Sequence, residues 1–142
     1  MKYLLDTDHI SILQWQTGTE FVTLSTRMGL HSPSDFAVSI ISFHEQVLGG
    51  HAYINRAKTS SDLAQGYRIL AQVLMDYRSA AVVPFDAIAA SAYDGFASLR
   101  SKVKSMDLRI AAIALANGLT VLTRNARDFS LVPRLIVQDW TV

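Results

Sequence analysis

Short apolar segments alternate with longer segments of helical pattern along the chain, and this alternation limits the possible folds most strongly. The following five segments have the length and the β-branched or apolar content of buried strands: 2–5, 36–41, 80–85, 120–123 and 135–140. Strands that alternate with helices predict an α/β fold with a mainly parallel sheet. We therefore expect three layers, α/β/α, with about five strands in the middle layer.

Capping residues locate several of the helices between these strands. The first helix should begin at Thr7 or Asp8, either of which could serve as its N-cap. Residues 44–79 have the pattern of a helical pair. Asp86 should cap the helix after the third strand, and Gly118 should end the helix before the fourth strand.

Composition indicates one compact domain that spans residues 1–142. Half of the residues are apolar, and 18% are charged, which excludes an intrinsically disordered chain. The chain contains no cysteine, so disulfides and thiolate metal sites are excluded. Asp6 interrupts the N-terminal apolar run, and no segment has the length of a membrane span. We expect a cytoplasmic protein without a membrane segment.

Charge is unevenly distributed although the formal net charge is only +1. Residues 100–134 hold seven of the thirteen basic side chains and only two acidic ones, Asp107 and Asp128. A local basic excess of this kind can contact phosphates, but a solvated helix edge would explain it equally well. The low net charge excludes indiscriminate coating of nucleic acid.

Acidic residues recur where the predicted strands end or where an adjacent helix begins. Asp6 directly follows the first strand, and Glu45 lies four residues after the second. Asp107 begins the helix before the fourth strand, while Asn125 and Asp128 follow that strand. Because ligands of open parallel sheets bind outside the carboxyl ends of the strands, these side chains should converge at one sheet edge.

A cluster of carboxylates predicts a bound cation, because neighbouring carboxylates raise each other's pKa unless a positive charge keeps them ionised. Hard oxygen ligands without cysteine favour Mg²⁺ or Mn²⁺ over zinc. Such an ion can activate a water molecule and orient a phosphodiester for in-line displacement.

Most of these acids also have a purely structural interpretation. Asp8 would be favourable in the first turn of a helix. Glu45 has capping-box spacing from Ser42, and Asp107 could be a helix N-cap. Asp6 is hardest to explain structurally, because a charge directly after a buried strand needs a partner. Apolar faces predict that Trp15, Phe43, Phe96 and Trp140 lie in the core or are partly buried.

Four segments of the chain together resemble the PIN-domain ribonucleases, and specifically the VapC-type toxins of bacterial toxin–antitoxin pairs. They are "YLLDTDHIS", "VSIISFHEQVLGG", "MDLRIAAIALANGLTVLTRNARDF" and "LIVQDW". The resemblance covers nearly the whole chain in order and with family-like spacing. It implies a Mg²⁺-dependent endoribonuclease that acts on RNA, forms homodimers and is inhibited by a cognate antitoxin.

The same resemblance assigns roles to individual residues. It implies that Asp6, Glu45 and Asp107 are the acidic metal ligands and that Thr123 supports them by hydrogen bonding. Asn125 stands where many relatives carry a fourth acid, so a second metal site depends on whether Asp128 can substitute. Asp8 should tune the helix start and could bind through an outer-shell water. On charge alone, the expected RNA contacts are Arg100, Lys102, Arg124 and Arg127.

Other functions remain open from the sequence. The chain could be a catalytically inactive PIN domain that only binds partners. "LLDTDHI" also resembles the start of haloacid dehalogenase-type phosphatases, in which Asp6 would be the nucleophile and Asp8 the acid/base. A response-regulator receiver is a third possibility, although Gln138 and Asp139 stand where its lysine is expected.

Overall fold

The computed structural model describes all 142 residues and contains a five-stranded, fully parallel sheet. Its strands are β1 (Tyr3–Leu5), β2 (Phe36–Ser39), β3 (Val82–Val83), β4 (Thr120–Leu122) and β5 (Val137–Gln138). Their order across the sheet is β3-β2-β1-β4-β5. The predicted parallel α/β sheet is confirmed. All five strands are shorter than predicted. In the case of β2, the strand ends at Ser39 because the next helix already begins at Ile40.

Seven α-helices connect the strands. They are α1 (Thr7–Trp15), α2 (Thr19–Met28), α3 (Ile40–Arg56), α4 (Ser60–Arg78), α5 (Ala87–Asp94), α6 (Ser105–Asn117) and α7 (Ala126–Phe129). Short 3₁₀ turns lie at Pro33–Asp35 and Ala97–Leu99. Asp86 caps α5 through the backbone N–H of Ala89, and Gly118 ends α6 with a φ of 65°, as predicted.

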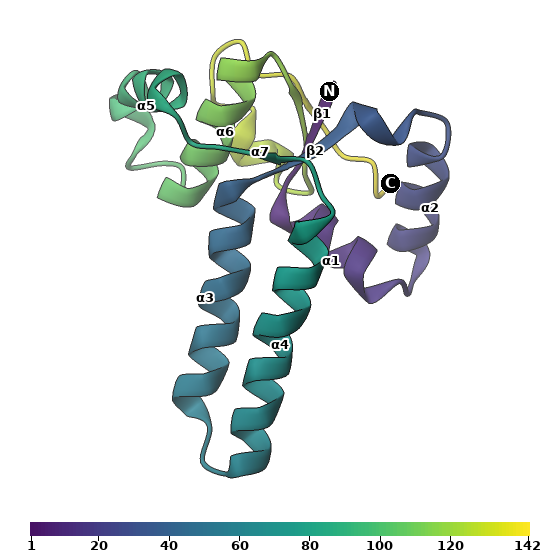
Figure 1. Ribbon diagram of the computed structural model, residues 1–142. Coiled ribbons are helices and arrows are strands. Elements are labelled where there is room, and N and C mark those ends of the chain that lie inside the picture. Colours follow the sequence, from purple (N-terminus) through teal and green to yellow (C-terminus); the bar gives the residue numbers. More distant parts are fainter.

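Helices lie on both faces of the sheet (Figure 1). A separate apolar cluster fills the space between the sheet and the helices on each side. Successive strand residues point to opposite faces, and the two clusters follow this rule. Leu4 and Val121 belong to the cluster under α5 and α6, whereas Leu5 and Leu122 belong to the cluster under α1 and α2. The structure thus has the predicted three-layer α/β/α arrangement.

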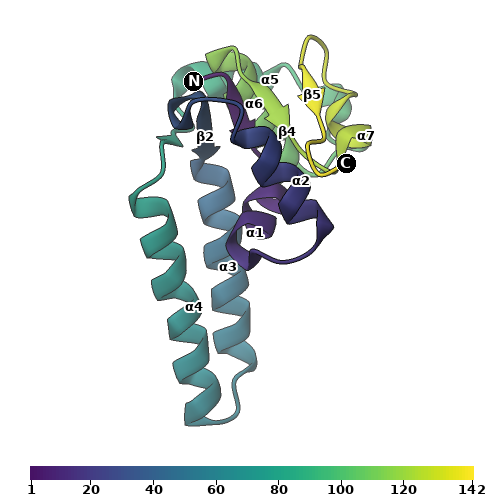
Figure 2. The ribbon, with the colours of Figure 1, turned by 90° about the vertical axis from the view of Figure 1, so that its right-hand side faces the viewer.

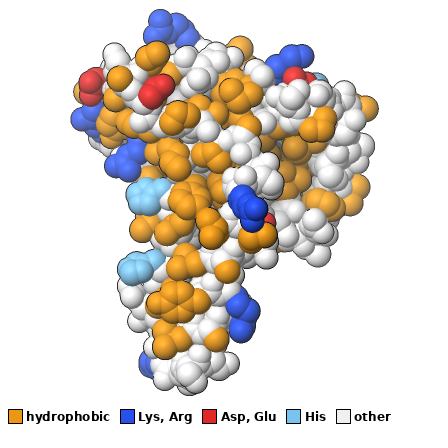
Figure 3. All heavy atoms as spheres, in the orientation of Figure 1, with side chains coloured by type: hydrophobic (Ala, Val, Ile, Leu, Met, Phe, Trp, Pro, Cys, Tyr) orange, Lys and Arg blue, Asp and Glu red, His pale blue; other side chains and the backbone are white.

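The helices α3 and α4 form a hairpin that projects from the rest of the molecule (Figures 1 and 2). Two glycines allow these helices to approach closely. A Cβ atom at Gly50 would lie 2.7 Å from Leu70 Cδ2, and one at Gly66 would lie 2.5 Å from Ile54 Cγ1. Hydrophobic side chains remain visible along the hairpin (Figure 3), because part of its apolar surface has no partner within the chain.

Two local expectations are wrong. The N-cap of α1 is Asp6 rather than Thr7 or Asp8, because the Asp6 carboxylate accepts the backbone N–H of Thr7. Trp15 is 70% exposed at the end of α1 and takes no part in the core. None of the helices combines the length and the apolar character that crossing a bilayer requires.

Candidate active site

A cleft of about 550 Å³ lies at the carboxyl ends of the strands and contains the predicted acidic residues. The chain leaves β1 towards β2 on one side and reaches β4 on the other, so the strand order reverses beside β1. Parallel sheets bind ligands at such reversal points. The lining residues are Asp6, Thr7, Asp8, Glu45, Lys104, Ser105, Met106, Asp107, Asn125 and Asp128.

Asp6 lies at the centre of this edge, and only 6% of its surface is exposed. One carboxylate oxygen accepts the backbone N–H of Thr7 at 2.8 Å, and the other accepts the hydroxyl of Thr123 at 2.7 Å. Burial, together with the neighbouring charge of Asp8, raises the pKa of Asp6 to about 7, although these two hydrogen bonds act in the opposite direction. Ionised Asp6 therefore needs a cation nearby.

Glu45 reaches the cleft from α3 and is oriented by Thr7. The Thr7 hydroxyl lies 2.8 Å from Glu45 Oε1 and 2.9 Å from Ser42 Oγ. The capping-box interpretation of Glu45 is wrong, because Ser39 is the N-cap of α3 and accepts the backbone N–H of Ser42. Glu45 has no capping function, so its carboxylate is available to the cleft.

Asp107 lies in the first turn of α6 and shares a hydrogen-bond donor with Asp128. The side-chain amide of Asn125 lies 3.1 Å from Asp107 Oδ2 and 3.1 Å from Asp128 Oδ2. The N-cap position of α6 belongs to Lys104, so Asp107 is not needed as a cap. Burial, and next the charge of Glu45, raises the pKa of Asp107, while Asn125 and Lys104 oppose this rise.

Asp8 does more than favour the start of a helix. Its Oδ1 lies 2.8 Å from the Nδ1 atom of His9, and its Oδ2 accepts the backbone N–H of Arg124 at 2.9 Å. Thr123 Oγ1 lies 3.3 Å from the same Oδ2 atom. Asp8 therefore ties the start of α1 to the loop after β4, a contact between residues 116 positions apart.

Four residues that line the cleft were not assigned to the site from the sequence: Thr7, Lys104, Ser105 and Met106. Thr7 was considered only as a helix cap, because a lone threonine beside acidic residues has many explanations. His9 is fully buried and does not line the cleft, and it too was assigned no role. Lys104 is exposed and lines the cleft from the N-cap of α6. Its position three residues before Asp107 was the available signal, because that spacing returns a side chain to the same helix face.

The four residues predicted to contact RNA lie outside the residues that line the cleft. Arg124 and Arg127 are exposed beside Asn125 and in α7, close to the cleft in sequence. Lys102 is exposed in the turn before α6. The guanidinium of Arg100 lies 4.8 Å from the centre of the Tyr93 ring. Of these four residues, Arg124 and Arg127 are the closest in sequence to residues that line the cleft.

The donors in the cleft fit Mg²⁺ or Mn²⁺ in their chemistry. Asp6, Glu45 and Asp107 supply hard carboxylate oxygens from three different elements, and no histidine or cysteine lines the cleft. The raised pKa values of Asp6 and Asp107 reflect burial and mutual repulsion that a cation would relieve. As the side chains stand, no three acidic or histidine side chains form a ready-made metal site. Ligation would require them to draw closer together.

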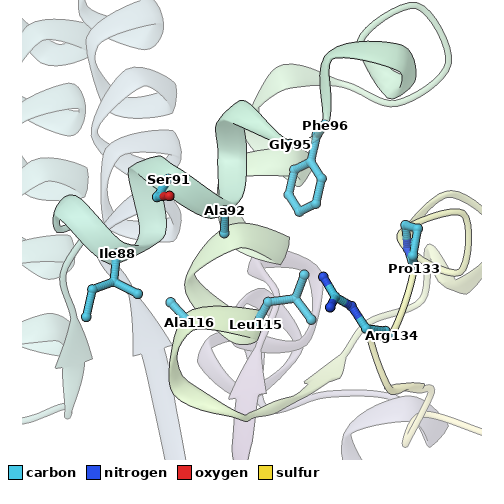
Figure 4. Close-up of a pocket in the computed structure, with 9 residues that line it drawn as sticks. All are labelled: Ile88, Ser91, Ala92, Gly95, Phe96, Leu115, Ala116, Pro133 and Arg134. Carbon is cyan, nitrogen blue, oxygen red and sulfur yellow. The ribbon is translucent and has the colours of Figure 1, made fainter.

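A larger hollow of about 640 Å³ lies elsewhere, between α5, the end of α6 and the loop before β5. Figure 4 shows its largely apolar wall, with the guanidinium of Arg134 pointing towards Leu115. Arg134 is the only charged residue that lines it. It has no carboxylate that could bind a metal ion, so the smaller cleft is the candidate active site.

Comparison with known proteins finds matches among solved structures only. No protein-family model matches the sequence, and no curated protein matches it. Solved structures do match. A chain of the DNA-bound VapBC complex from Salmonella typhimurium is 25% identical, with a TM-score of 0.75 and coverage of 99% of this chain and 98% of that one.

Two further structures agree. A chain of FitAcB from Neisseria gonorrhoeae is 25% identical, with a TM-score of 0.70 and 99% coverage of both chains. A chain of VapBC-1 from nontypeable Haemophilus influenzae is 22% identical, with a TM-score of 0.75 and full coverage of both chains. The chain therefore has a PIN-like fold over its whole length, and its neighbours among VapBC complexes are consistent with a PIN-domain toxin of the VapC type.

Proposed function

We propose that this protein is a Mg²⁺- or Mn²⁺-dependent endoribonuclease and the toxin of a type II toxin–antitoxin pair. One observation carries the proposal. Carboxylates from the start of α1, from α3 and from the start of α6 line a single cleft, in a chain whose fold matches chains of VapBC complexes. This arrangement gathers negatively charged side chains at the sheet edge where α/β sheets bind ligands. A divalent cation would bind between them.

Asp6, Glu45 and Asp107 would hold the ion. A bound divalent ion supplies an activated water and stabilises the charge that develops during in-line displacement at phosphorus. The chain itself orients these ligands, because the hydroxyls of Thr123 and Thr7 bond to Asp6 and Glu45 respectively. Fixed orientation lowers the reorganisation that the reaction requires.

Asn125 favours a single tightly held ion. Its amide bridges Asp107 and Asp128, so it stabilises two neighbouring charges without adding a third. A second ion would have to use Asp128 as its principal ligand. We therefore expect one ion per cleft at low metal concentration.

Basic side chains at the rim compensate the negative charge of the cleft. Lys104 lines the cleft, and Arg124 and Arg127 are exposed near it. Cations in these places would attract the RNA backbone towards acids that otherwise repel it. Together with Lys102 and Arg100, they form the proposed path for RNA.

An antitoxin and a second copy of this chain are the proposed protein partners. Four of the structural neighbours are described as VapBC complexes, and two of these four contain DNA. The α3–α4 hairpin offers surface for such contacts, since Leu48, Leu63, Tyr67, Leu74 and Met75 are exposed on it. Light scattering of the purified protein measures its molar mass and so tests the proposed dimer.

Because the proposed substrate is RNA, we propose that the protein acts in the cytoplasm.

The phosphatase and receiver alternatives fit the structure less well. A phosphatase nucleophile must reach its substrate, yet Asp6 is 6% exposed and both its oxygens accept hydrogen bonds. Receiver domains have the strand order 2-1-3-4-5, whereas this sheet has the order 3-2-1-4-5. An inactive PIN-like binding module shares the fold and is separated only by assay.

Cleavage of single-stranded RNA tests the proposal. Wild-type protein should cut an internally labelled RNA with Mg²⁺ and lose this activity in EDTA. Asp107→Asn should reduce the rate by about 100-fold or more, because it removes a ligand charge, while the exposed Asp94→Asn should retain full activity. No metal-dependent cleavage by folded wild-type protein would favour the inactive module. Cleavage by Asp107→Asn at the wild-type rate would refute the site.

A further inference from the structure

His9 is a fully buried histidine beside the cleft whose two ring nitrogens both have partners. Its exposed fraction is 0%. Nδ1 lies 2.8 Å from Asp8 Oδ1, and the backbone N–H of Trp140 points to Nε2 at 3.3 Å. The ring therefore bridges the first turn of α1 and the C-terminal segment.

These partners define which nitrogen carries the proton. Because the Trp140 N–H donates to Nε2, that nitrogen must present its lone pair. The proton then resides on Nδ1 and is donated to Asp8. Asp139 Oδ1 lies 3.8 Å from Nε2, but it already accepts the backbone N–H and the hydroxyl of Thr141.

Trp140 is itself held firmly, so it gives His9 a fixed support. Its ring packs against those of Tyr3 at 4.7 Å, His31 at 5.1 Å and Phe36 at 5.8 Å between ring centres. The guanidinium of Arg27 lies 4.9 Å from the centre of the same ring. Trp140 is 3% exposed. The position of the His9 ring is therefore set from outside the cleft.

Hydrogen bonds continue from Asp8 to the predicted metal ligands. Asp8 Oδ2 accepts the Arg124 N–H and lies 3.3 Å from Thr123 Oγ1. Thr123 Oγ1 donates to Asp6 at 2.7 Å and accepts the backbone N–H of Asn125 at 2.9 Å. The orientation of Asp8 thus affects both Asp6 and the loop that carries Asn125.

We propose that His9 is a positioning residue for the proposed nuclease: its Nδ1–H fixes Asp8, and Asp8 holds Thr123 and the loop after β4 in the geometry that orients Asp6. The effect on rate rests on the proposed function. The hydrogen-bond arrangement does not, because it can be measured in the protein without substrate.

Nitrogen NMR of ¹⁵N-histidine-labelled wild-type protein tests the arrangement directly. The spectrum should show His9 protonated at Nδ1 and unprotonated at Nε2. Proton on Nε2 would overturn the proposal, because Nδ1 could then not donate to Asp8. A doubly protonated ring would also overturn it, because Nε2 could then not accept from Trp140.

Two substitutions separate the two ring nitrogens. His9→Asn places an amide near the Nδ1 position and can still donate to Asp8. His9→Gln places an amide near the Nε2 position and loses that donor. We expect His9→Gln to lower kcat by about 10- to 100-fold with little change in KM, and His9→Asn to retain most of the activity.

The outcomes distinguish positioning from general stability and from failure of the proposed function. Equal losses of kcat in both variants would overturn positioning through Nδ1, as would full activity in His9→Gln. His51→Gln is the matched control, because His51 is an exposed histidine of α3 whose side chain hydrogen-bonds to Asn55, away from the cleft residues. If wild-type protein cleaves no RNA, the proposed function fails, and the NMR measurement with a Mg²⁺ titration of both variants still decides the role of His9. In that titration, His9→Gln should bind Mg²⁺ about 10- to 100-fold more weakly than His9→Asn, and equal affinities would overturn the proposal.

Discussion

Replacing Asp6 by asparagine should stabilise the metal-free protein at alkaline pH. The pKa of Asp6 is about 7 in the folded protein, against 3.8 for the ordinary side chain. The folded state therefore holds the proton more tightly than the unfolded state does. Protonated Asp6 therefore contributes to the free energy of unfolding. This contribution is fully present below pH 3.8 and is lost as the pH rises through about 7.

The size of the effect follows from this difference in pKa. Complete ionisation of Asp6 costs the folded state about 4 kcal/mol. Asparagine removes this cost, but its amide nitrogen cannot accept the Thr123 hydroxyl, which costs about 1 kcal/mol. Repulsion by the charges of Asp8 and Asp107 contributes to the cost of ionising Asp6, so the cost does not belong to Asp6 alone. We therefore expect Asp6→Asn to raise the free energy of unfolding by about 1 to 3 kcal/mol at pH 8. This gain should disappear near pH 5.

Urea denaturation in EDTA at several pH values between 5 and 8 measures this gain, with tryptophan fluorescence as the signal. Saturating Mg²⁺ should stabilise the wild type more than Asp6→Asn, because the ion binds the folded site. A variant that is less stable than wild type at pH 8 would refute the reasoning. So would a difference between the two proteins that stays constant with pH.

Four further substitutions test three other parts of the molecule. Thr7→Val removes the hydroxyl that orients Glu45, and kcat for RNA cleavage should fall about 10- to 100-fold with stability nearly unchanged; unchanged kcat would contradict this role. Gly66→Ala should destabilise the protein by about 1 to 3 kcal/mol in thermal unfolding, because its Cβ would clash with α3, whereas Gly49→Ala has free space and should stabilise it by up to about 1 kcal/mol. Similar effects of the two alanines would show that the helix contact does not limit packing. Lys104→Gln should raise KM for RNA and reduce the salt dependence of binding by about one phosphate contact; an unchanged salt slope would place Lys104 off the RNA path.

The sequence predicted the architecture because periodicity and capping are local properties. Gly118 and Asp86 mark helix boundaries through their own backbone or side chain, and the structure confirms both. It predicted the convergence of the acids because parallel strands place their carboxyl ends at one edge, and the cleft contains them. Their role as metal ligands stays a prediction.

Side-chain partners were less predictable, because they depend on contacts between distant segments. Asp8 has the sequence signature of a helix start, yet its oxygens bind His9 and the backbone of Arg124. Trp15 was expected to be buried at least in part on its apolar character alone, but it lies at the end of α1 with 70% of its surface exposed. In both cases the burial and the partners of the side chain depend on residues far away in the sequence, which the local pattern does not reveal.

The raised pKa of Asp6 links the stability of the fold to the proposed activity. A side chain selected only for stability would be neutral at this buried position, because ionisation there opposes folding. The chain instead keeps a carboxylate and surrounds it with donors, of which Thr123 is the closest side chain. Those donors lower the cost of ionisation without removing it. The remaining repulsion is what a divalent cation would neutralise, so the least favourable charge in the metal-free protein should become the strongest contributor to metal binding.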